Sequence, residues 1–261
     1  MMSLIKKTIR SIPGSVAVYT LLRRAIRSIR VAGEFHRYSQ LAREQSTPMV
    51  PKWKDRQFFL DNRTAQTPFD RHYVYHTAWA TRQLVRLRPA EHVDVSSSLY
   101  FVALASAIVP MRHLDYRPPA LHLDNLECSA GDLMALPFAD GSVQSLSCMH
   151  VIEHVGLGRY GDPLDPLGDA KACRELSRVL AVGGTLLFVT PVGRARICFN
   201  GHRIYSFAMI QALFPTLELR EWALIPDNGP EGIIPNATPE MVNAQSYACG
   251  CFVFCKRSLG A

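Results

Sequence analysis

The alternation of apolar and polar positions separates a helical first part of the chain from a second part in which strands and helices follow one another. From His92 onward, short apolar runs alternate with stretches of helical periodicity, and this order predicts a mostly parallel β-sheet covered by helices on both faces. The last two apolar runs have no helix between them, which indicates an antiparallel hairpin at one edge of the sheet. The expected strands are 92–95, 112–116, 126–129, 143–149, 185–190, 217–225 and 248–254, and the expected helices are 99–109, 165–180 and 206–214.

Turn-forming residues set several of these boundaries. Asp165 followed by Pro166 is typical of a helix N-cap with proline in the first helical position. The pair Gly183-Gly184 is expected to end the same helix, and Pro191 is expected to end the strand after it.

The first 46 residues are predicted to form two helical stretches, interrupted at Pro13-Gly14. In the second stretch, apolar side chains recur at spacings of three and four residues, and arginines occupy much of the remaining surface, which describes a basic amphipathic helix. We expect residues 15–31 to lie on an anionic membrane surface through this helix. The alternative is that the apolar stripe packs on the rest of the protein or on a second copy of itself. The stripe consists of Val18, Leu21, Leu22, Ile26 and Ile29, and the basic side chains are Arg23, Arg24, Arg27 and Arg30.

Three segments follow from these patterns. Residues 1–46 form a basic helical arm. Residues 47–90 comprise an irregular connector and a helix, from Asp70 to Leu87, that packs on the core. Residues 91–261 form the α/β domain.

The charge distribution bears on partners and location. The first 46 residues hold nine basic and two acidic side chains, whereas the remaining residues hold 20 of each sign. A basic surface over the whole protein is therefore not supported, and nucleic acid is not an expected partner. No apolar run reaches the roughly 18–20 residues that span a bilayer, and no small-residue cleavage site follows the short apolar run 15–22. We expect a cytoplasmic protein that contacts the inner membrane surface through its arm.

The chain has seven cysteines, an odd number without the spacing of a disulfide scaffold, which favours free thiols in a reducing compartment. Cys249, Cys251 and Cys255 share one face of a predicted strand. A metal site and a set of small buried thiols both fit this pattern. We favour the buried thiols and expect no metal.

Four blocks of sequence resemble one known family. Residues 148–155 read Cys-Met-His-Val-Ile-Glu-His-Val, and residues 178–184 read Arg-Val-Leu-Ala-Val-Gly-Gly before a strong apolar strand. Upstream lie Gly131-Asp132 and the Leu-Pro-Phe of residues 136–138. In this order and spacing the blocks resemble class I S-adenosylmethionine-dependent methyltransferases. The resemblance implies a Rossmann-like three-layer sandwich with a mostly parallel sheet and an antiparallel edge hairpin.

Residues 93–98, 149–163 and 202–206 more closely resemble an uncharacterised bacterial group within that fold, a domain of unknown function. Members of this group often look associated with surface-polysaccharide synthesis. The resemblance therefore implies a methyltransferase that acts on a small or glycan-type acceptor.

The resemblance also implies the cofactor S-adenosylmethionine and the residues that contact it. Asp115, at the end of the second strand, would bind the ribose hydroxyls, and Asp132 with the backbone of Leu133 would bind the adenine edge. The alternative for both aspartates is a solvated strand-end carboxylate or a turn cap. The full set of expected cofactor-binding residues is Asp94, Ser96, Ser98, Asp115, Asp132, Leu133 and Met149.

The loop after the first strand departs from the family. Ser96-Ser97-Ser98 stands where the family has a Gly-x-Gly turn, and serine resists a positive φ. The serines either contact a carboxylate of the cofactor or only cap the following helix. This departure motivates the alternative function, a degenerate fold that serves as a non-catalytic binding or assembly module.

Polar side chains near the fourth and fifth strand ends are candidates for acceptor chemistry. Methyl transfer requires an acceptor held about 3 Å from the methyl carbon, and an oxygen acceptor also needs a base, expected to be His150 or His202. The alternative for the Glu-His pair of the turn is that it only anchors the loop, whose three glycines suit a mobile lid. The expected catalytic residues are His150, Glu153, His154 and His202, and the expected substrate-binding residues are Arg159, Tyr160, Asp162, Arg203 and Tyr205.

Overall fold

The computed structural model describes residues 15–257, which divide into two compact units between Pro68 and Phe69. The expected helical stretch before Pro13 and the interruption at Pro13-Gly14 lie outside the described residues. We describe each unit by itself.

The first unit is built on one long helix, α2 (Ser15–Glu44). The chain then folds back along this helix through the 3-10 turn η1 (Trp53–Asp55), so that the Trp53 ring lies 5.0 Å from the Phe35 ring. Arg63 pairs with Glu34 at 2.8 Å. No helix of the described residues is long and apolar enough to cross a membrane.

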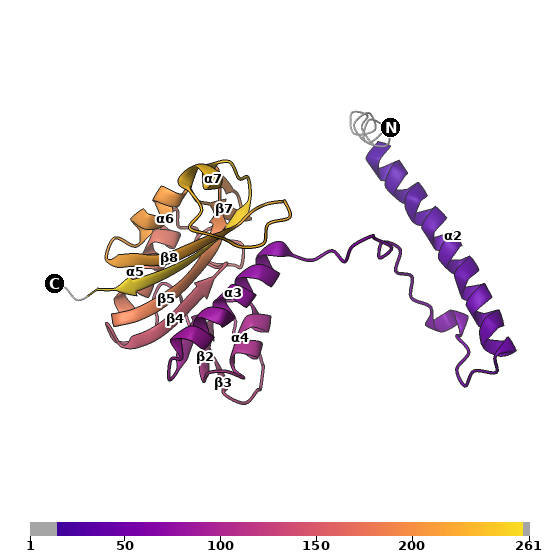
Figure 1. Cartoon of the computed structure of the whole chain (residues 1–261), viewed down its shortest axis with the longest axis horizontal. Coiled ribbons are helices and arrows are strands. Elements are labelled where there is room, and N and C mark those ends of the chain that lie inside the picture. The colour runs from indigo at the N-terminus through magenta and orange to yellow at the C-terminus, as the bar shows by residue number, and fades with distance from the viewer. Residues whose placement is uncertain (1–14, 258–261) are drawn as a thin grey trace. The chain divides into compact units, whose positions relative to one another are not determined.

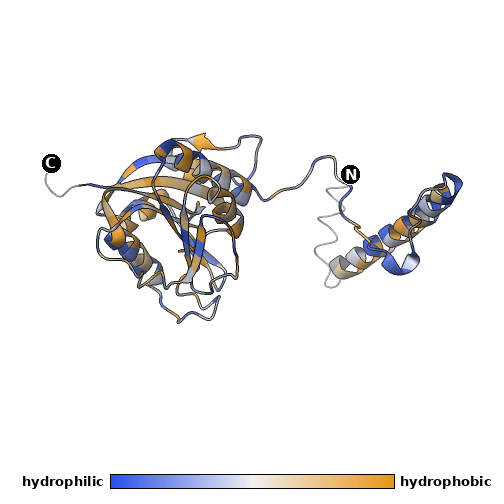
Figure 2. Ribbon diagram, turned by 90° about the horizontal axis from the view of Figure 1, so that it is seen from below, coloured by the Kyte–Doolittle hydropathy of each residue, from blue (hydrophilic) through white to orange (hydrophobic). Residues whose placement is uncertain are grey.

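The apolar stripe of α2 is solvent-exposed where the returning segment does not cover it. Ile26 is 66% and Ile29 is 73% exposed. Figure 2 shows apolar and polar residues alternating along this helix. The helix is therefore present, as expected, and these apolar side chains are exposed.

The second unit contains an eight-stranded sheet. Its first five strands in space are parallel, and β10 is antiparallel to both of its neighbours, β5 and β8. This arrangement confirms the expected Rossmann-like sheet with an antiparallel edge. The spatial order is β3 (Leu126–Ala130), β2 (Met111–Asp115), β1 (His92–Val95), β4 (Val143–Met149), β5 (Leu180–Val192), β10 (Ala248–Lys256), β8 (Leu217–Ile225) and β9 (Ile234–Pro235).

Helices cover both faces of the sheet, and each face has its own core (Figure 1). One face carries α3 (Arg71–Leu87) and α4 (Leu99–Ala105), which pack with side chains such as Trp79 and Phe101. The other face carries α5 (Gly168–Val179), α6 (Phe207–Leu213) and α7 (Pro239–Asn243). The helix from Asp70, with its aspartate as N-cap, thus belongs to the sheet-containing unit.

Three boundary predictions are wrong. Helix α5 begins at Gly168, and Asp165 instead accepts a hydrogen bond from the Leu167 N–H at 3.0 Å in the preceding turn. Gly183-Gly184 lies inside β5, where the register to β4 shifts and Gly183 adopts a φ of +75°. Pro191 also lies inside β5, because it pairs opposite Cys249 of an antiparallel neighbour.

Other short elements escaped the sequence analysis. The hairpin β6 (Arg196–Cys198) and β7 (His202–Ile204), the strand β9 and the helix α7 were not expected. The helix expected over 99–109 ends at Ala105 and continues as turns.

Candidate functional site

A cavity of about 330 Å³ lies at the carboxyl ends of the parallel strands β1, β2, β3 and β4. This is the edge at which open α/β sheets bind ligands, and the volume lies within the range of small-molecule sites. Of the residues expected from the sequence, the cavity brings together Ser96, Asp115, Asp132, Leu133, His150, His154, Tyr160 and Asp162.

The serine loop adopts the conformation that glycine usually supplies. Ser96 has a φ of +55°, and its N–H donates to the Leu114 carbonyl at 2.8 Å. Ser97 is buried, and its hydroxyl accepts a hydrogen bond from the Met149 N–H at 3.1 Å. Ser98 stands at the N-cap position of α4 without a capping side-chain hydrogen bond. Ser96 therefore adopts the left-handed conformation although it carries a Cβ atom.

Asp94 holds this loop from beneath. Its side chain is fully buried and accepts hydrogen bonds from His113 Nδ1 at 2.9 Å, from the Ser97 N–H at 3.1 Å and from the Ser147 hydroxyl. Burial alone would raise the pKa of Asp94, but the hydrogen bond and charge of His113 hold this pKa below its usual value. Asp94 therefore holds the backbone of the serine loop in place and does not itself line the cavity.

Asp115 and Asp132 occupy equivalent turns at the ends of β2 and β3. One carboxylate oxygen of each accepts a hydrogen bond from the backbone N–H two residues later, at 2.7 Å for Arg117 and 2.8 Å for Met134. The turn-cap interpretation thus holds for one oxygen of each carboxylate. The second oxygen has no hydrogen-bond donor among residues 15–257 and remains available to a ligand.

Gly131 makes a close approach possible beside these turns. A Cβ atom on Gly131 would lie 2.8 Å from the Leu114 side chain, which is far inside van der Waals contact. The absence of a side chain lets the strand end pass over Leu114 and places Asp132 at the cavity.

The turn after β4 places His150 and Glu153 in contact. His150 has a φ of +58°, and its Nδ1 lies 2.9 Å from Glu153 Oε1. Glu153 is 1% exposed, its second oxygen accepts from the Thr190 hydroxyl at 3.3 Å, and burial raises its pKa to about 7. Its backbone carbonyl also accepts from the Arg203 N–H at 2.9 Å. The pair therefore anchors the turn, and His150 additionally lines the cavity.

His154 contacts the backbone of Gly201, and His202 is the next residue in the chain. The His154 Nδ1 lies 2.7 Å from the Gly201 carbonyl, and Arg159 Nη1 lies 3.0 Å from the same oxygen. His202, on β7, is half-buried, and its ring centroid lies 4.8 Å from that of Tyr247. Burial lowers the pKa of both histidines. Of the two, His154 lines the cavity.

Asp162 organises the glycine-containing loop. Its carboxylate accepts hydrogen bonds from the Gly156 N–H at 2.8 Å and the Tyr160 N–H at 3.2 Å. Gly156 and Gly158 have φ values of +76° and +70°, so the glycines serve a hydrogen-bonded turn. Tyr160 is 44% exposed, and the Arg117 guanidinium lies 4.9 Å from its ring centroid.

Eight of the expected site residues do not line the cavity, namely Asp94, Ser98, Met149, Glu153, Arg159, His202, Arg203 and Tyr205. Arg203 and Tyr205 are 5% and 1% exposed, and both contact Asp169 of α5, at 3.4 Å and 3.0 Å. Met149 is 1% exposed and packs under α3 and α4. Arg203 and Tyr205 therefore contact α5 and do not face the cavity.

Sequence analysis missed the side chains that α3 contributes. The rings of His72, Tyr73 and His76 lie 5.3, 5.4 and 5.0 Å from the His150 ring, centroid to centroid. Burial lowers the pKa of His72 to about 4 and that of His76 to about 3. Histidines four residues apart on a predicted helix were the available signal, since such a pair shares one face.

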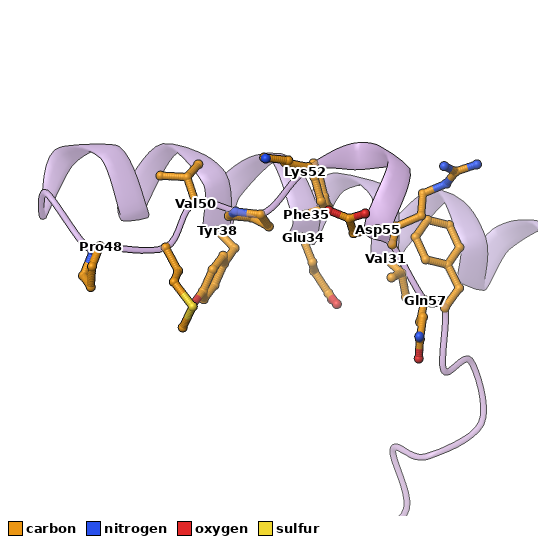
Figure 3. A pocket seen from close by; sticks show the side chains of 13 residues that line it. Val31, Glu34, Phe35, Tyr38, Pro48, Val50, Lys52, Asp55 and Gln57 are labelled. Carbon is orange, nitrogen blue, oxygen red and sulfur yellow. The ribbon is translucent and has the colours of Figure 1, made fainter.

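A second hollow lies in the first unit. It is a groove of about 910 Å³ between α2 and the returning segment, with Val31, Phe35 and Tyr38 on the helix side (Figure 3). Its lining includes charged side chains from both segments, but no histidine or cysteine and none of the residues expected in the site. The candidate site is therefore the smaller cavity at the sheet edge, where ionisable side chains converge.

Comparison with known proteins gives the fold and a partial family match. Residues 140–222 match a family described as a Caenorhabditis protein of unknown function, DUF268. This family is not described from bacteria, so the match does not confirm the expected bacterial group. No curated protein matches the sequence.

Solved structures resemble most of the chain. One is a chain of the complex between the Haloferax volcanii Trm112 methyltransferase activator and its assigned methyltransferase, with a TM-score of 0.50, 20% identity and coverage of 74% of this chain and 92% of that chain. Another is an assigned sarcosine dimethylglycine methyltransferase from Galdieria sulphuraria, with a TM-score of 0.51, 14% identity and coverage of 70% and 86%. At these identities the likeness establishes the fold, which is that of the class I methyltransferases.

Proposed function

We propose that the chain is a methyltransferase that binds S-adenosylmethionine in the cavity at the sheet edge. The observation that supports this most is the joint position of Asp115, Asp132 and a left-handed turn at Ser96 around one cavity on a class I methyltransferase fold. These are the groups that a nucleoside with two hydroxyls and an amino-substituted ring requires.

The chain would hold the cofactor through three contacts. The free oxygen of Asp115 would accept hydrogen bonds from the ribose hydroxyls, and Asp132 with the Leu133 N–H would bind the adenine edge. The turn at Ser96 would let the backbone approach the rest of the cofactor. Asp94, Ser98 and Met149 would support this turn from beneath it and from its flanks.

The cofactor, when bound, supplies an electrophilic methyl group. The acceptor oxygen must lose its proton as it gains the methyl group, and His154 is the residue that we propose to take it. The Gly201 carbonyl, 2.7 Å from Nδ1, favours the tautomer with a lone pair on Nε2. Arg159 Nη1 lies 3.1 Å from Nδ1 and 3.4 Å from Nε2, so the guanidinium must turn away for this lone pair to reach the acceptor. Arg159 is exposed beside the same ring and would orient the acceptor together with Tyr160.

This assignment shifts the base from the residues first expected. His150 is 8% exposed, its Nδ1 is held by Glu153, and its Nε2 lies 3.5 Å from the buried Cys249 thiol, so neither ring nitrogen is presented to the acceptor. His202 does not line the cavity, and Arg203 and Tyr205 are buried against Asp169. We therefore propose positioning roles for Glu153, His202, Arg203, Tyr205 and Asp162, in place of contact with the acceptor.

The acceptor that we propose is a small or glycan-type molecule, with intermediates of surface-polysaccharide synthesis as the class implied by the sequence resemblance. The charge of the second unit supports a non-nucleic acceptor, since residues 69–261 hold 16 basic and 18 acidic side chains. This near-neutral balance gives no overall attraction for a polyanion.

We also propose that α2 attaches the protein to the cytoplasmic surface of an anionic membrane. Residues 1–68 hold 13 basic and four acidic side chains, and the apolar stripe beside the arginines is exposed. Each basic residue near an anionic surface contributes about 1 kcal/mol. Arg27 pairs with Asp61 and Arg30 lies 3.7 Å from Glu34, so Arg23 and Arg24 contribute most.

Calorimetry with S-adenosylmethionine and its demethylated product tests the cofactor site. We expect binding by the full-length chain and at least about a tenfold loss in the variant Asp115→Asn, because a carboxylate accepts hydrogen bonds about twice as strongly as a neutral amide. Asp124→Asn is the matched control, because Asp124 is an exposed aspartate in the turn before β3 and does not line the cavity. No binding at millimolar ligand contradicts the proposal.

A second measurement separates the enzyme from a binding module. With cofactor bound, the full-length chain is expected to form the demethylated product with a panel of sugar and small-molecule acceptors. His154→Gln is expected to slow this reaction by about 10²–10⁴, while the exposed control His122→Gln leaves it unchanged. Tight cofactor binding without product on any acceptor would favour the non-catalytic alternative.

Vesicle co-sedimentation tests the membrane contact. The full-length chain is expected to bind anionic vesicles, with weaker binding at raised salt. Ile26→Glu should reduce this binding, whereas Met49→Glu, which also adds one charge to an exposed apolar position outside the helix, should not. Failure to bind anionic vesicles at low salt contradicts the proposal.

A further inference from the structure

Three buried side chains from distant parts of the second unit converge beside the cavity. His72, His150 and Cys249 each offer one donor atom, and these three atoms lie within 4.8 Å of one another. All three residues are buried. We propose that they bind a zinc ion.

The fold brings these residues together without help from sequence proximity. His72 lies in the first turn of α3, His150 in the turn that follows β4, and Cys249 near the start of β10. Helix α3 packs on β10, and β10 pairs with β5, whose other neighbour is β4. The Cys249 Sγ consequently lies 3.5 Å from His150 Nε2.

The hydrogen bonds of the two histidines leave one ring nitrogen of each for a metal. His150 Nδ1 is held by Glu153 at 2.9 Å, and His72 Nε2 lies 3.1 Å from the Tyr247 carbonyl. Histidines that bind metals almost always donate the other ring N–H to a carboxylate or a backbone carbonyl. In this arrangement the second nitrogen carries a lone pair, so His150 Nε2 and His72 Nδ1 are the expected ligand atoms.

A third histidine adds an independent observation. His76, one turn after His72, places its Nδ1 2.6 Å from the His72 carbonyl, and its Nε2 is buried without a hydrogen-bond partner among the described residues. A buried unpaired polar atom costs about 1–3 kcal/mol and requires an explanation. Its ring centroid lies 5.0 Å from that of His150, so His76 lies beside the proposed site but outside the group of three converging donor atoms.

The donor set selects the type of ion. Imidazole nitrogen and thiolate sulfur suit zinc, whereas calcium and magnesium require oxygen ligands. Zinc binding would convert the Cys249 thiol to a thiolate, and the proton would pass to solvent as the Zn–S bond forms. Tetrahedral coordination brings donors to about 3–4 Å, so the three groups need to close by only about 1 Å.

The sequence alone favoured small buried thiols at this strand. That interpretation holds for Cys251, which faces the same side of β10 under α3 and is fully buried. Cys249 differs because two histidines reach it. Cys251 shares its residue type, strand, face and burial with Cys249 and contacts the Cys249 thiol, so its replacement tests whether any buried thiol of this strand accounts for the metal signal.

Metal analysis of the full-length chain tests the proposal. After removal of metal with a chelator, the chain is expected to rebind zinc in a one-to-one ratio. Cobalt in place of zinc should give the near-ultraviolet charge-transfer absorption of a Co–thiolate bond. Cys249→Ser should abolish that absorption and weaken zinc binding at least by the roughly 10- to 100-fold that loss of a supporting contact costs, while Cys251→Ser should retain both.

Circular dichroism of each variant shows whether it folds, and the cobalt spectrum of the unaltered chain does not depend on any variant. Absence of zinc binding by the unaltered chain, a cobalt complex without thiolate absorption, or equal losses in Cys249→Ser and Cys251→Ser would each overturn the proposal. Because the readout is metal content and absorption, the result is independent of whether the chain binds S-adenosylmethionine.

Discussion

Replacing Asp94 with asparagine removes the charge at the buried centre beneath the serine loop. The Asp94 and His113 side chains are both fully buried, and the carboxylate accepts hydrogen bonds from three groups. Removing one partner of a buried charged pair costs about 3–5 kcal/mol. Asparagine keeps the shape and one acceptor oxygen, so we expect Asp94→Asn to lower the free energy of unfolding by about 3 kcal/mol.

The loss should depend on pH in a defined way. The pKa of Asp94 is held below 3.8, so its stabilisation is present above that value and is lost as the pH falls through the folded-state pKa. Burial alone would lower the pKa of His113, but Asp94 raises it above 6.5, so its stabilisation is complete below pH 6.5 and is lost as the pH rises through the folded-state pKa. The difference between the two proteins should be largest between pH 3.8 and 6.5.

Urea denaturation at several pH values measures this difference. The transition of the second unit can be followed by the fluorescence of Trp79 and Trp222, with the exposed variant Asp124→Asn as a control expected to stay within about 0.5 kcal/mol of the unaltered chain. A loss below about 1 kcal/mol for Asp94→Asn, or a loss independent of pH, would show that Asp94 and His113 do not form a charged pair.

Two further predictions concern backbone conformation. Ser96→Gly should stabilise the second unit by about 0.5–1 kcal/mol in the same denaturation assay. A left-handed residue with a Cβ atom costs about 1–2 kcal/mol, and the greater backbone entropy of glycine in the unfolded chain offsets part of this gain. The control Ser98→Gly, at a φ of −56°, should bring no gain. Gly131→Ala should destabilise that unit by about 1–3 kcal/mol, because the added Cβ atom would lie 2.8 Å from the Leu114 side chain. Thermal melting should show no destabilisation for the control Gly33→Ala, whose position on α2 has no atom within 4 Å of the added Cβ.

Several strands were predictable because turn-forming residues bound them. The ranges 92–95, 143–149 and 217–225 match β1, β4 and β8 to the residue. Each contains polar residues, but Pro89 precedes the first, Gly141-Ser142 precedes the second and Pro226 follows the third. For such elements local pattern and tertiary environment agree.

The extent of β5 was not predictable from local rules. Pro191 cannot donate a hydrogen bond, and Gly183-Gly184 usually ends a helix, so both indicate interruptions. In the structure β5 runs from Leu180 to Val192, because antiparallel pairing with β10 continues past the proline and a register shift absorbs the glycines. The first outcome depends on β10, where Pro191 pairs opposite Cys249, and the second depends on β4, where Ser145 pairs opposite Thr185. Both partners are far from β5 in the sequence.

The candidate site was predictable where residues lie at strand ends. Asp115 is the last residue of β2, and Asp132 and His150 follow β3 and β4, so the topology brings all three to one edge. The contribution of α3 was not predictable, because tertiary packing decides which helix lies beside the site. The role of Asp94 was also hidden, since its partner His113 lies one strand away and both look like ordinary polar residues in a strand.

The position of β10 has a consequence for how the protein is made. This strand pairs with β5 along one edge and with β8 along the other, so it separates two strands that precede it in the chain. During synthesis, a ribosome that has not yet released residues 248–256 carries a sheet with a gap, and β8 has no parallel or antiparallel partner on that side. The sheet of the second unit is therefore complete only after β10 has left the ribosome. A message that ends before Ala248 would leave two unpaired apolar edges, the kind of surface that chaperones and proteases recognise.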